Sequence, residues 1–236
     1  MTPDRPVGIL AEDGHGIAVA RALQRLLPRE DLLLLCDDAY APYARRRPAV
    51  VVARVTSLLG ELRADGAKII VIASPQAVLD ALATQPAGSV ALIGLEAPIA
   101  QAGAVSGGGA VAAVVVEGGV RPRTFGQALR RTRGASAIHL EQWPLDDADA
   151  VAARVPALIA AGVGALALTS PALARLRPAI ERASGGELPI VEAGDVAAQR
   201  VQRTLRHAGL LARRRRPGRL IVISSNPSRA AGPLTA

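Results

Sequence analysis

Residues 70–78 read IVIASPQAV, and residues 165–173 read ALALTSPAL. In both stretches an aliphatic run stops at a Ser-Pro pair, Ser74-Pro75 in the first and Ser170-Pro171 in the second. Short aliphatic runs bounded by turn residues are typical of strands buried in a parallel sheet. Serine is favoured at a helix N-cap and proline at the first helical position. Each stretch therefore predicts a strand followed directly by a helix.

The same alternation of strand and helix continues along the chain. The apolar patterns predict strands over residues 7–10, 32–36, 68–73, 90–94, 110–116, 137–140, 165–168, 190–191 and 220–223. They predict helices over residues 17–27, 49–65, 75–82, 121–131, 148–161, 171–183 and 196–205. This repetition predicts an α/β fold of two similar doubly wound lobes, with a ligand cleft at the carboxyl ends of the strands. Because the last strand is expected to return to the first half, we assign residues 1–95 plus 206–236 to the N-terminal lobe and 96–205 to the second.

Composition narrows the class of protein. The 236 residues are 50% hydrophobic but only 2% aromatic, which suits a core of Ala, Val, Leu and Ile beneath helices. No apolar run reaches the length of a membrane span, and the first residues lack the plan of a signal peptide, so we expect a cytoplasmic protein without membrane association. The single cysteine, Cys36, excludes an internal disulfide and a zinc knuckle. We expect no metal site.

The net charge of +8 raises the possibility of nucleic-acid binding. The two dense runs, Arg45–Arg47 and Arg213–Arg216, contain no aromatic residues on which bases could stack. Lys68 is the only lysine, so the excess of arginine is typical of a codon-composition bias. The sequence therefore favours a solvated surface over a nucleic-acid site, with residues 213–216 as the better candidate of the two runs.

Seven segments, in order and at matching spacing, give the chain its resemblance to a known family: residues 6–10, 26–31, 36–43, 70–73, 176–180, 192–195 and 224–227. Residues 36–43 (CDDAYAPY), for example, are similar to the family motif GDTAxxPYG, and residues 176–178 to the LRP that follows a second motif, GCTHYP. The chain resembles a glutamate racemase of the aspartate/glutamate racemase superfamily. This resemblance implies a two-lobed fold and an isomerase that needs no cofactor. It also implies a role in D-glutamate supply for peptidoglycan and, commonly for the family, a homodimer.

The departures from the family pattern lie where the chemistry should be. Family members move the α-proton of glutamate with two cysteines, and the resemblance places Ser74 and Ser170 at those positions. The supporting acids align with Ala11 and Ala172, and a serine that binds substrate aligns with Glu12. A thiol has a pKa of about 8.5, whereas a serine alkoxide needs a strong partner base. The resemblance therefore implies an enzyme site that has lost its catalytic groups.

A few residues remain candidates for ligand binding. The resemblance leaves Tyr43 and Asp37 from the inner shell, and adds Glu12, Ser74, Gln76 and Ser170 as positions that line the cleft. His15, in the turn after the first strand, could act as an acid or base near neutral pH, although a surface turn is the favoured interpretation. For both serines we favour a helix-cap role over a nucleophilic one.

The sequence thus favours a pseudoenzyme that binds a neutral or cationic ligand in the interlobe cleft, or a partner protein, including a dimer with an authentic racemase. One alternative is a surviving or altered isomerase that uses His15, Glu12 or Asp37 as its base. Another follows from the resemblance, because some glutamate racemases inhibit DNA gyrase. The contact would then be the arginine run at 213–216.

Overall fold

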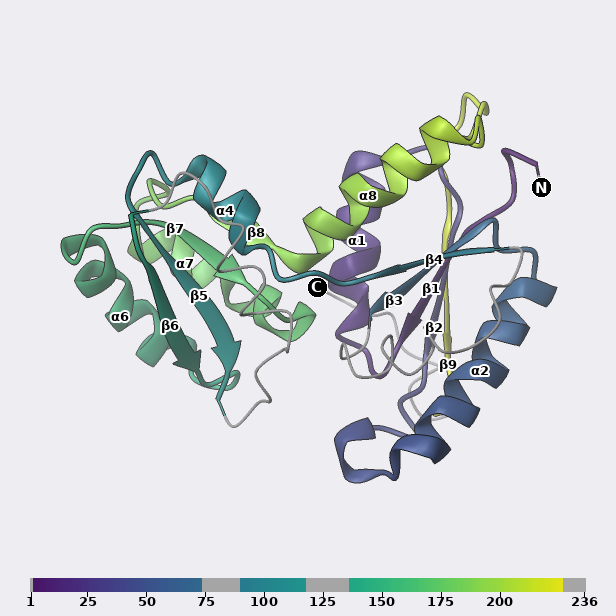
Figure 1. Ribbon diagram of the computed structural model, residues 1–236, viewed down its shortest axis with the longest axis horizontal. Coiled ribbons are helices and arrows are strands. Elements are labelled where there is room, and N and C mark those ends of the chain that lie inside the picture. Colours follow the sequence, from purple (N-terminus) through teal and green to yellow (C-terminus); the bar gives the residue numbers. More distant parts are fainter. Residues whose placement is uncertain (1, 74–89, 118–135, 227–236) are drawn as a thin grey trace. The chain divides into compact units, whose positions relative to one another are not determined.

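The computed structural model describes residues 2–73, 90–117 and 136–226, and the chain divides into two compact units (Figure 1). The first contains Met1–Leu95 and Ala197–Ala236, and the second contains Glu96–Val196. Each unit is a parallel sheet with helices on both faces, which confirms the predicted α/β fold class. In the described residues no helix combines the length and apolar character that crossing a bilayer requires.

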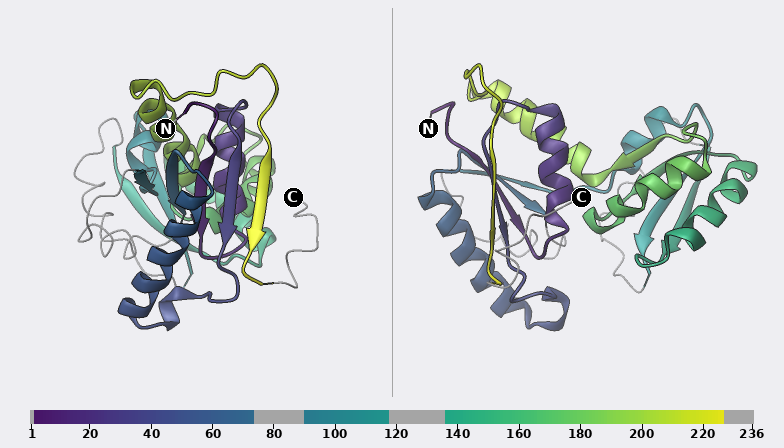
Figure 2. Two further views of the ribbon diagram at one scale, coloured as in Figure 1. Left: turned by 90° about the vertical axis from the view of Figure 1, so that its right-hand side faces the viewer. Right: turned by 180° about the vertical axis from the view of Figure 1, so that it is seen from behind.

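The sheet of the first unit has five strands in the order β4-β3-β1-β2-β9, and every neighbouring pair is parallel. Its strands are β1 (Val7–Ala11), β2 (Leu32–Cys36), β3 (Ile69–Ala73), β4 (Ala91–Gly94) and β9 (Leu220–Ser224). The three central strands are buried along their whole length, which explains their continuous aliphatic sequences. Figure 2 shows β9, the yellow strand from the end of the chain, beside β2 at the edge of the sheet.

Helices cover both faces of this sheet. On one face, α1 (Gly16–Leu26) and the part of α8 (Ala193–His207) that belongs to this unit bury Val19, Leu23 and Val201 against the strands. On the other face, α2 (Pro48–Ala64) buries five aliphatic side chains. Proline at the first position of α2 fits a helix start, because its missing N–H would be unpaired there. A short 3₁₀ helix, η1 (Tyr43–Arg45), precedes α2.

The second unit repeats this plan with four parallel strands in the order β6-β5-β7-β8. They are β5 (Ala110–Val116), β6 (Ile138–Trp143), β7 (Val163–Leu168) and β8 (Ile190–Glu192). One face carries α6 (Ala148–Ala160), the 3₁₀ helix η2 (Pro171–Leu176) and α7 (Arg177–Ala183) over the buried Trp143, and the other carries α4 (Ile99–Val105). Asp147 caps α6 by accepting a hydrogen bond from the N–H of Ala150 at 2.8 Å.

Three elements differ from the sequence-based prediction. The continuous helix predicted over residues 171–183 is wrong, because η2 and α7 are separate. Leu176 joins them, and Pro178, at the start of α7, has no N–H with which to continue an α-helical ladder. Helix α4 was not predicted, because its small residues hide the helical period. Strand β6 extends to Trp143, past the predicted end at 140, through the polar residues Glu141 and Gln142. The predicted helices at 75–82 and 121–131 lie outside the described residues.

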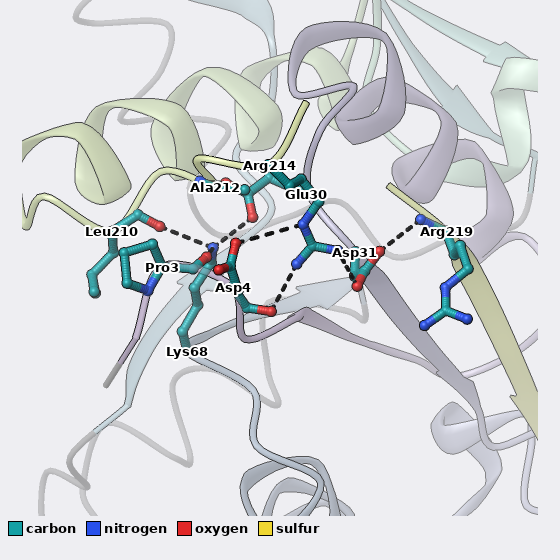
Figure 3. A network of polar contacts seen from close by, with 9 residues as sticks. All are labelled: Pro3, Asp4, Glu30, Asp31, Lys68, Leu210, Ala212, Arg214 and Arg219. Carbon is teal, nitrogen blue, oxygen red and sulfur yellow. Dashed lines mark hydrogen bonds and ion pairs between the residues drawn. The ribbon is translucent and has the colours of Figure 1, made fainter. Parts of the chain in front are cut away.

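A buried ion pair joins distant segments of the first unit at the amino ends of its strands (Figure 3). Lys68 and Glu30 have side chains that are 0% and 2% exposed, and their N–O distance is 2.5 Å. The Lys68 ammonium also donates to the carbonyl oxygen of Leu210 at 2.9 Å and to that of Pro3. All three of its N–H groups are therefore satisfied. The other oxygen of Glu30 accepts from the N–H of Ala212 at 2.8 Å.

Arg214 extends this network to the start of β9. Its guanidinium is paired with the Asp31 carboxylate and donates to the carbonyl oxygen of Asp4 at 2.8 Å. Asp31 also accepts from the N–H of Arg219 at 2.8 Å. Burial acts to raise the pKa of Asp31, but the bonds from Arg214 and Arg219 outweigh it and lower that pKa. The network thus holds residues 210–219 in place. This segment leads directly into β9, the outer strand beside β2.

We expect Lys68→Met to lower the free energy of unfolding by about 3–5 kcal/mol, because it leaves the Glu30 carboxylate buried without a cation. Urea unfolding followed by far-ultraviolet circular dichroism measures this loss. Adding Glu30→Gln to the variant removes the stranded charge and should recover part of the stability. The neighbouring exposed Arg29→Met is the control, with an expected change within about 0.5 kcal/mol. A Lys68→Met variant as stable as Arg29→Met would contradict the structural role.

Candidate functional site at the carboxyl edge of the first sheet

Parallel pairing brings several polar residues to one edge of the first sheet. In the strand register Ala11 lies beside Cys36 and Ala73, and Cys36 lies beside Ser224. The residues that follow these strand ends are Glu12, Asp37 and Ser225, so the loops carrying them are neighbours. The carboxyl ends of parallel strands are where ligands bind in open α/β sheets. Ser74, which follows β3, and Gln76 lie outside the described residues.

Asp37 is the most deeply buried acid at this edge, with a side chain that is 0% exposed. The Arg54 guanidinium from α2 donates to it through two nitrogens, Nη2 at 2.7 Å and Nε at 3.1 Å. The Tyr43 hydroxyl adds a third hydrogen bond at 3.1 Å. Burial acts to raise the pKa of Asp37, but the hydrogen bonds from Arg54 and Tyr43 outweigh it and lower the pKa. Asp37 is therefore an ionised, fully paired carboxylate.

Tyr43 links Asp37 to the first loop. Burial, followed by the negative charge of Asp37, raises the pKa of its phenol, so Tyr43 stays neutral. Its backbone N–H donates to the Glu12 carboxylate at 2.5 Å. Burial also raises the pKa of Glu12, and the charges of Asp13 and Asp37 act in the same direction, against the hydrogen bond from Tyr43. The structure thus brings Glu12, Asp37 and Tyr43 together, and their role in ligand binding stays a prediction.

The loops around this group are held by local hydrogen bonds. Asp38 accepts from the N–H of Gly14 at 3.1 Å and from the Ser224 hydroxyl at 2.7 Å. Ser225 accepts from the N–H of Ala39 at 3.1 Å, so the end of β9 supports the loop after β2. Gly16 begins α1 directly against β1, where a Cβ atom would lie 2.3 Å from that of Ala11. Only glycine allows that approach.

His15 lies in an exposed turn. Its ring nitrogen Nδ1 is 3.0 Å from the Asp13 carboxylate, and the two side chains are 44% and 39% exposed. The N–H of His15 also donates to Asp13 at 2.9 Å, a hydrogen bond typical of a local turn. The surface-turn interpretation is confirmed for this residue. In the part of the chain that the structure describes, no group of three or more His, Cys, Asp or Glu residues is arranged to hold a metal ion.

Ser170 and Ala172 lie in the second unit, after β7. The Ser170 hydroxyl accepts from the N–H of Ala172 at 3.4 Å and so caps η2, whose first residue is Pro171. Ala172 and Leu173 are buried beneath this turn. Ser170 is therefore the N-cap that the sequence predicts, although the helix it starts is 3₁₀. A hollow of about 420 Å³ opens nearby at the ends of β5 and β6, lined by Val116, Glu117, Pro144, Leu145, Asp146 and Asp147.

No family model matches the chain. The sequence is 29% identical to a glutamate racemase of Methylococcus capsulatus, over 97% of this chain and 90% of that protein. It is 28% identical to a glutamate racemase of Pseudomonas entomophila, over 88% of this chain and 84% of that one. These matches support the glutamate racemase family.

Solved structures agree on the fold. A glutamate racemase isoform from Bacillus anthracis matches with a TM-score of 0.74 and 22% identity, over 96% of this chain and 90% of that one. The Escherichia coli glutamate racemase, solved with L-glutamate and the activator UDP-MurNAc-ala, matches with a TM-score of 0.67 and 18% identity. The match covers 94% of this chain and 91% of that one. An allantoin racemase from Klebsiella pneumoniae matches with a TM-score of 0.56 and 21% identity, over 88% of this chain and 90% of that one. The two-lobed α/β racemase fold therefore extends over almost the whole chain.

Arg54 is the residue of this site that sequence reasoning missed. It lies in α2 between aliphatic residues, in the stretch VVVARVTSLL at 50–59. A single charge beside the buried positions Val51 and Val55 is the available signal, because such a charge needs a partner. Sequence alone does not identify Asp37 as that partner.

We expect Arg54→Met to lower the free energy of unfolding at pH 7 by about 2 kcal/mol. Breaking a fully buried pair costs about 3–5 kcal/mol, and the partial exposure of Arg54 reduces that loss. The lowered pKa of Asp37 contributes stability above the unfolded pKa, and this contribution is lost as the pH falls through the folded value. The deficit of the variant should therefore shrink below about pH 4. Urea unfolding at pH 7 and pH 3 measures both values.

The matched control is Arg63→Met on the same helix. Its Nε atom is buried without a hydrogen-bond partner among the described residues, so its loss should cost little at either pH. Equal deficits for the two variants at pH 7, or an Arg54→Met deficit that grows on acidification, would contradict the pairing of Arg54 with Asp37.

Proposed function

We propose that this chain is a glutamate racemase-like protein that has lost racemase activity and acts as a ligand-binding or regulatory pseudoenzyme. The observation that carries the proposal is the contact between the Glu12 carboxylate and the Tyr43 N–H. The family resemblance places Glu12 where the family has a serine that binds substrate. A carboxylate of the chain itself therefore occupies a backbone donor at this position.

The second lobe supports the same interpretation. The family resemblance places the second catalytic cysteine at Ser170, whose hydroxyl is engaged as an N-cap. A serine hydroxyl is a very weak acid, so its alkoxide does not form without a strong partner base. Without that alkoxide, serine cannot remove a proton from carbon. The resemblance places the supporting histidine at Ala172, which is buried and carries no titratable group. Proline at 171 also removes one N–H donor from this turn.

The ligand that fits this edge is neutral or cationic. Glu12, Asp13 and Asp38 are acidic residues on the loops after β1 and β2, and Arg54, whose guanidinium contacts the group among the described residues, is bound to Asp37. A dicarboxylate such as glutamate would meet like charge there. A regulatory role would take the form of a dimer with an authentic racemase of the same fold, affecting D-glutamate supply for peptidoglycan.

A second candidate function is an altered isomerase activity on another amino acid. The raised pKa of Glu12 favours it, because a carboxylate with a raised pKa is the kind of group that serves as a general base near neutral pH. Asp37 is the weaker candidate for the base, since its lowered pKa reduces its affinity for a proton.

We expect no exchange of the α-proton of L- or D-glutamate in deuterated water, as measured by NMR against a heat-killed control. The double variant Ser74→Cys/Ser170→Cys should also be silent, because Glu12 still repels the substrate carboxylate. Exchange by the unmodified protein would overturn the proposal and direct attention to Glu12 as the base. Exchange by the double variant alone would show that the substrate site survives and that only the two thiols are missing.

Glu12→Ser should increase the affinity for D-glutamate by at least about tenfold, which corresponds to 1.4 kcal/mol. The change removes the like charge and frees the Tyr43 N–H. Calorimetric titration measures the affinity, with Asp13→Ser as the matched control, since it removes one negative charge from the adjacent exposed turn. If the two variants gain equally, general repulsion and not the Tyr43 contact excludes the substrate.

A further inference from the structure

Exposed arginines gather at the amino edge of the first sheet, opposite the candidate site. They come from the start of the chain, from the turn before β2 and from the segment that leads into β9. All are exposed, and we call them the arginine face: Arg5, Arg29, Arg213, Arg215, Arg216 and Arg219. Because the sheet is parallel, the segments that precede its strands share one edge, so residues far apart in sequence become neighbours.

The fold holds these segments close together. The N–H of Gly218 donates to the carbonyl oxygen of Pro28 at 2.9 Å. A Cβ atom at Gly218 would lie 1.9 Å from the carbonyl oxygen of Glu30, so the backbone itself packs against the turn that carries Arg29. Figure 3 shows how Arg214 turns toward Asp31, while the Arg219 side chain points away from the network. Arg214 therefore holds residues 213–216 in place, and the other three arginines of this run remain exposed.

Three carboxylates at this edge are engaged, whereas Asp65, in the turn before β3, is exposed. Glu30 is paired with Lys68, and Asp31 and Asp4 are paired with Arg214, at 3.6 Å for Asp4. Within the described residues, no arginine of the arginine face forms an ion pair with a carboxylate. In the described turns that precede the strands, Asp65 is the carboxylate outside these pairs, so six exposed arginines leave the edge positive. Such a surface is the electrostatic footprint of a polyanion site.

We propose that the arginine face binds the phosphate backbone of double-stranded nucleic acid without reading its sequence. Arginine forms bidentate hydrogen bonds with phosphate, and six of them on a held edge can follow a charged backbone. Single strands need aromatic platforms for their bases, whereas Tyr40 and Tyr43, the described aromatic residues of this unit, lie in the loop after β2 at the opposite edge. An anionic membrane would need apolar side chains to insert, and in the described part of this edge the exposed large ones are Leu26 and, near the start of β9, Ile221.

The structure provides what the sequence lacked for this inference. Read as a single run, residues 213–216 favour a solvated surface. In the fold, Arg214 binds Asp31 and no longer belongs to an exposed run. Arg5 and Arg29, from two distant segments, lie at the same edge as the other members of the run. The proposal is independent of the pseudoenzyme proposal, since it uses none of the residues at the carboxyl edge.

The test is fluorescence anisotropy of a labelled 20-base-pair DNA of mixed sequence, titrated with the full chain in about 50 to 200 mM NaCl. If about five phosphates are contacted, affinity should fall about 500-fold over this range. The triple variant Arg213→Ala/Arg215→Ala/Arg216→Ala should lower the slope of log affinity against log salt by about 2.7, because each phosphate contact contributes about 0.9.

The matched control is Arg45→Ala/Arg46→Ala/Arg47→Ala, which removes the same charge from the exposed run between β2 and α2 and should keep the original slope. Circular dichroism confirms that both variants are folded. Absence of duplex binding at 50 mM NaCl, or equal effects of the two triple variants, would overturn the proposal. So would tighter binding of a single strand of the same length, or binding to phosphatidylserine vesicles without binding to the duplex.

Discussion

The first unit depends on the ion pair between Lys68 and Glu30. Its sheet is assembled from the beginning and the end of the chain, and nothing covalent holds β9 against β2. The Lys68 ammonium binds a carboxylate and two backbone carbonyls from three different segments, including the one that leads into β9. Such a pair is costly to bury, and it stabilises the fold only because every donor and acceptor is matched. It therefore specifies the geometry of the edge more than it adds net stability.

The strands of the first sheet begin at its amino edge and end at its carboxyl edge, and these two edges differ in the charged groups that they carry. At the amino edge Glu30, Asp31 and Asp4 are engaged by Lys68 and Arg214, and the exposed arginines outnumber the exposed Asp65. At the carboxyl edge the positive charge of Arg54 is engaged by Asp37, and Glu12, Asp13 and Asp38 are further acidic residues on the same loops. A parallel sheet allows this separation, because each edge is built from a different set of loops. Surfaces of opposite sign can then occupy one domain without neutralising one another.

The sequence predicted the fold well, because buried parallel strands are continuous aliphatic runs and prolines mark the starts of α2 and of the 3₁₀ helix η2. It failed where small or polar residues hide the period, as in α4 and the end of β6. At the candidate site, the meeting of Glu12 and Asp37 could be predicted, since both directly follow adjacent strand ends, whereas Tyr43 joins them from the 3₁₀ helix η1. The pairing of Arg54 with Asp37 could not, because it depends on how α2 packs over the sheet. The arginine face escaped prediction for the same reason, since its members meet only in three dimensions.

The position of β9 also has a consequence for the order in which the chain can fold during synthesis. The second unit is one continuous segment, so it is complete before the last strand of the first unit has been translated. Until residue 224 leaves the ribosome, β2 has no β9 to pair with, so one side of this strand stays without its hydrogen-bond partner. Domains generally fold as units as they emerge, and unpaired strand edges are prone to aggregation. The early-emerging half of this protein is thus the one that depends longest on protection by the ribosome or by chaperones.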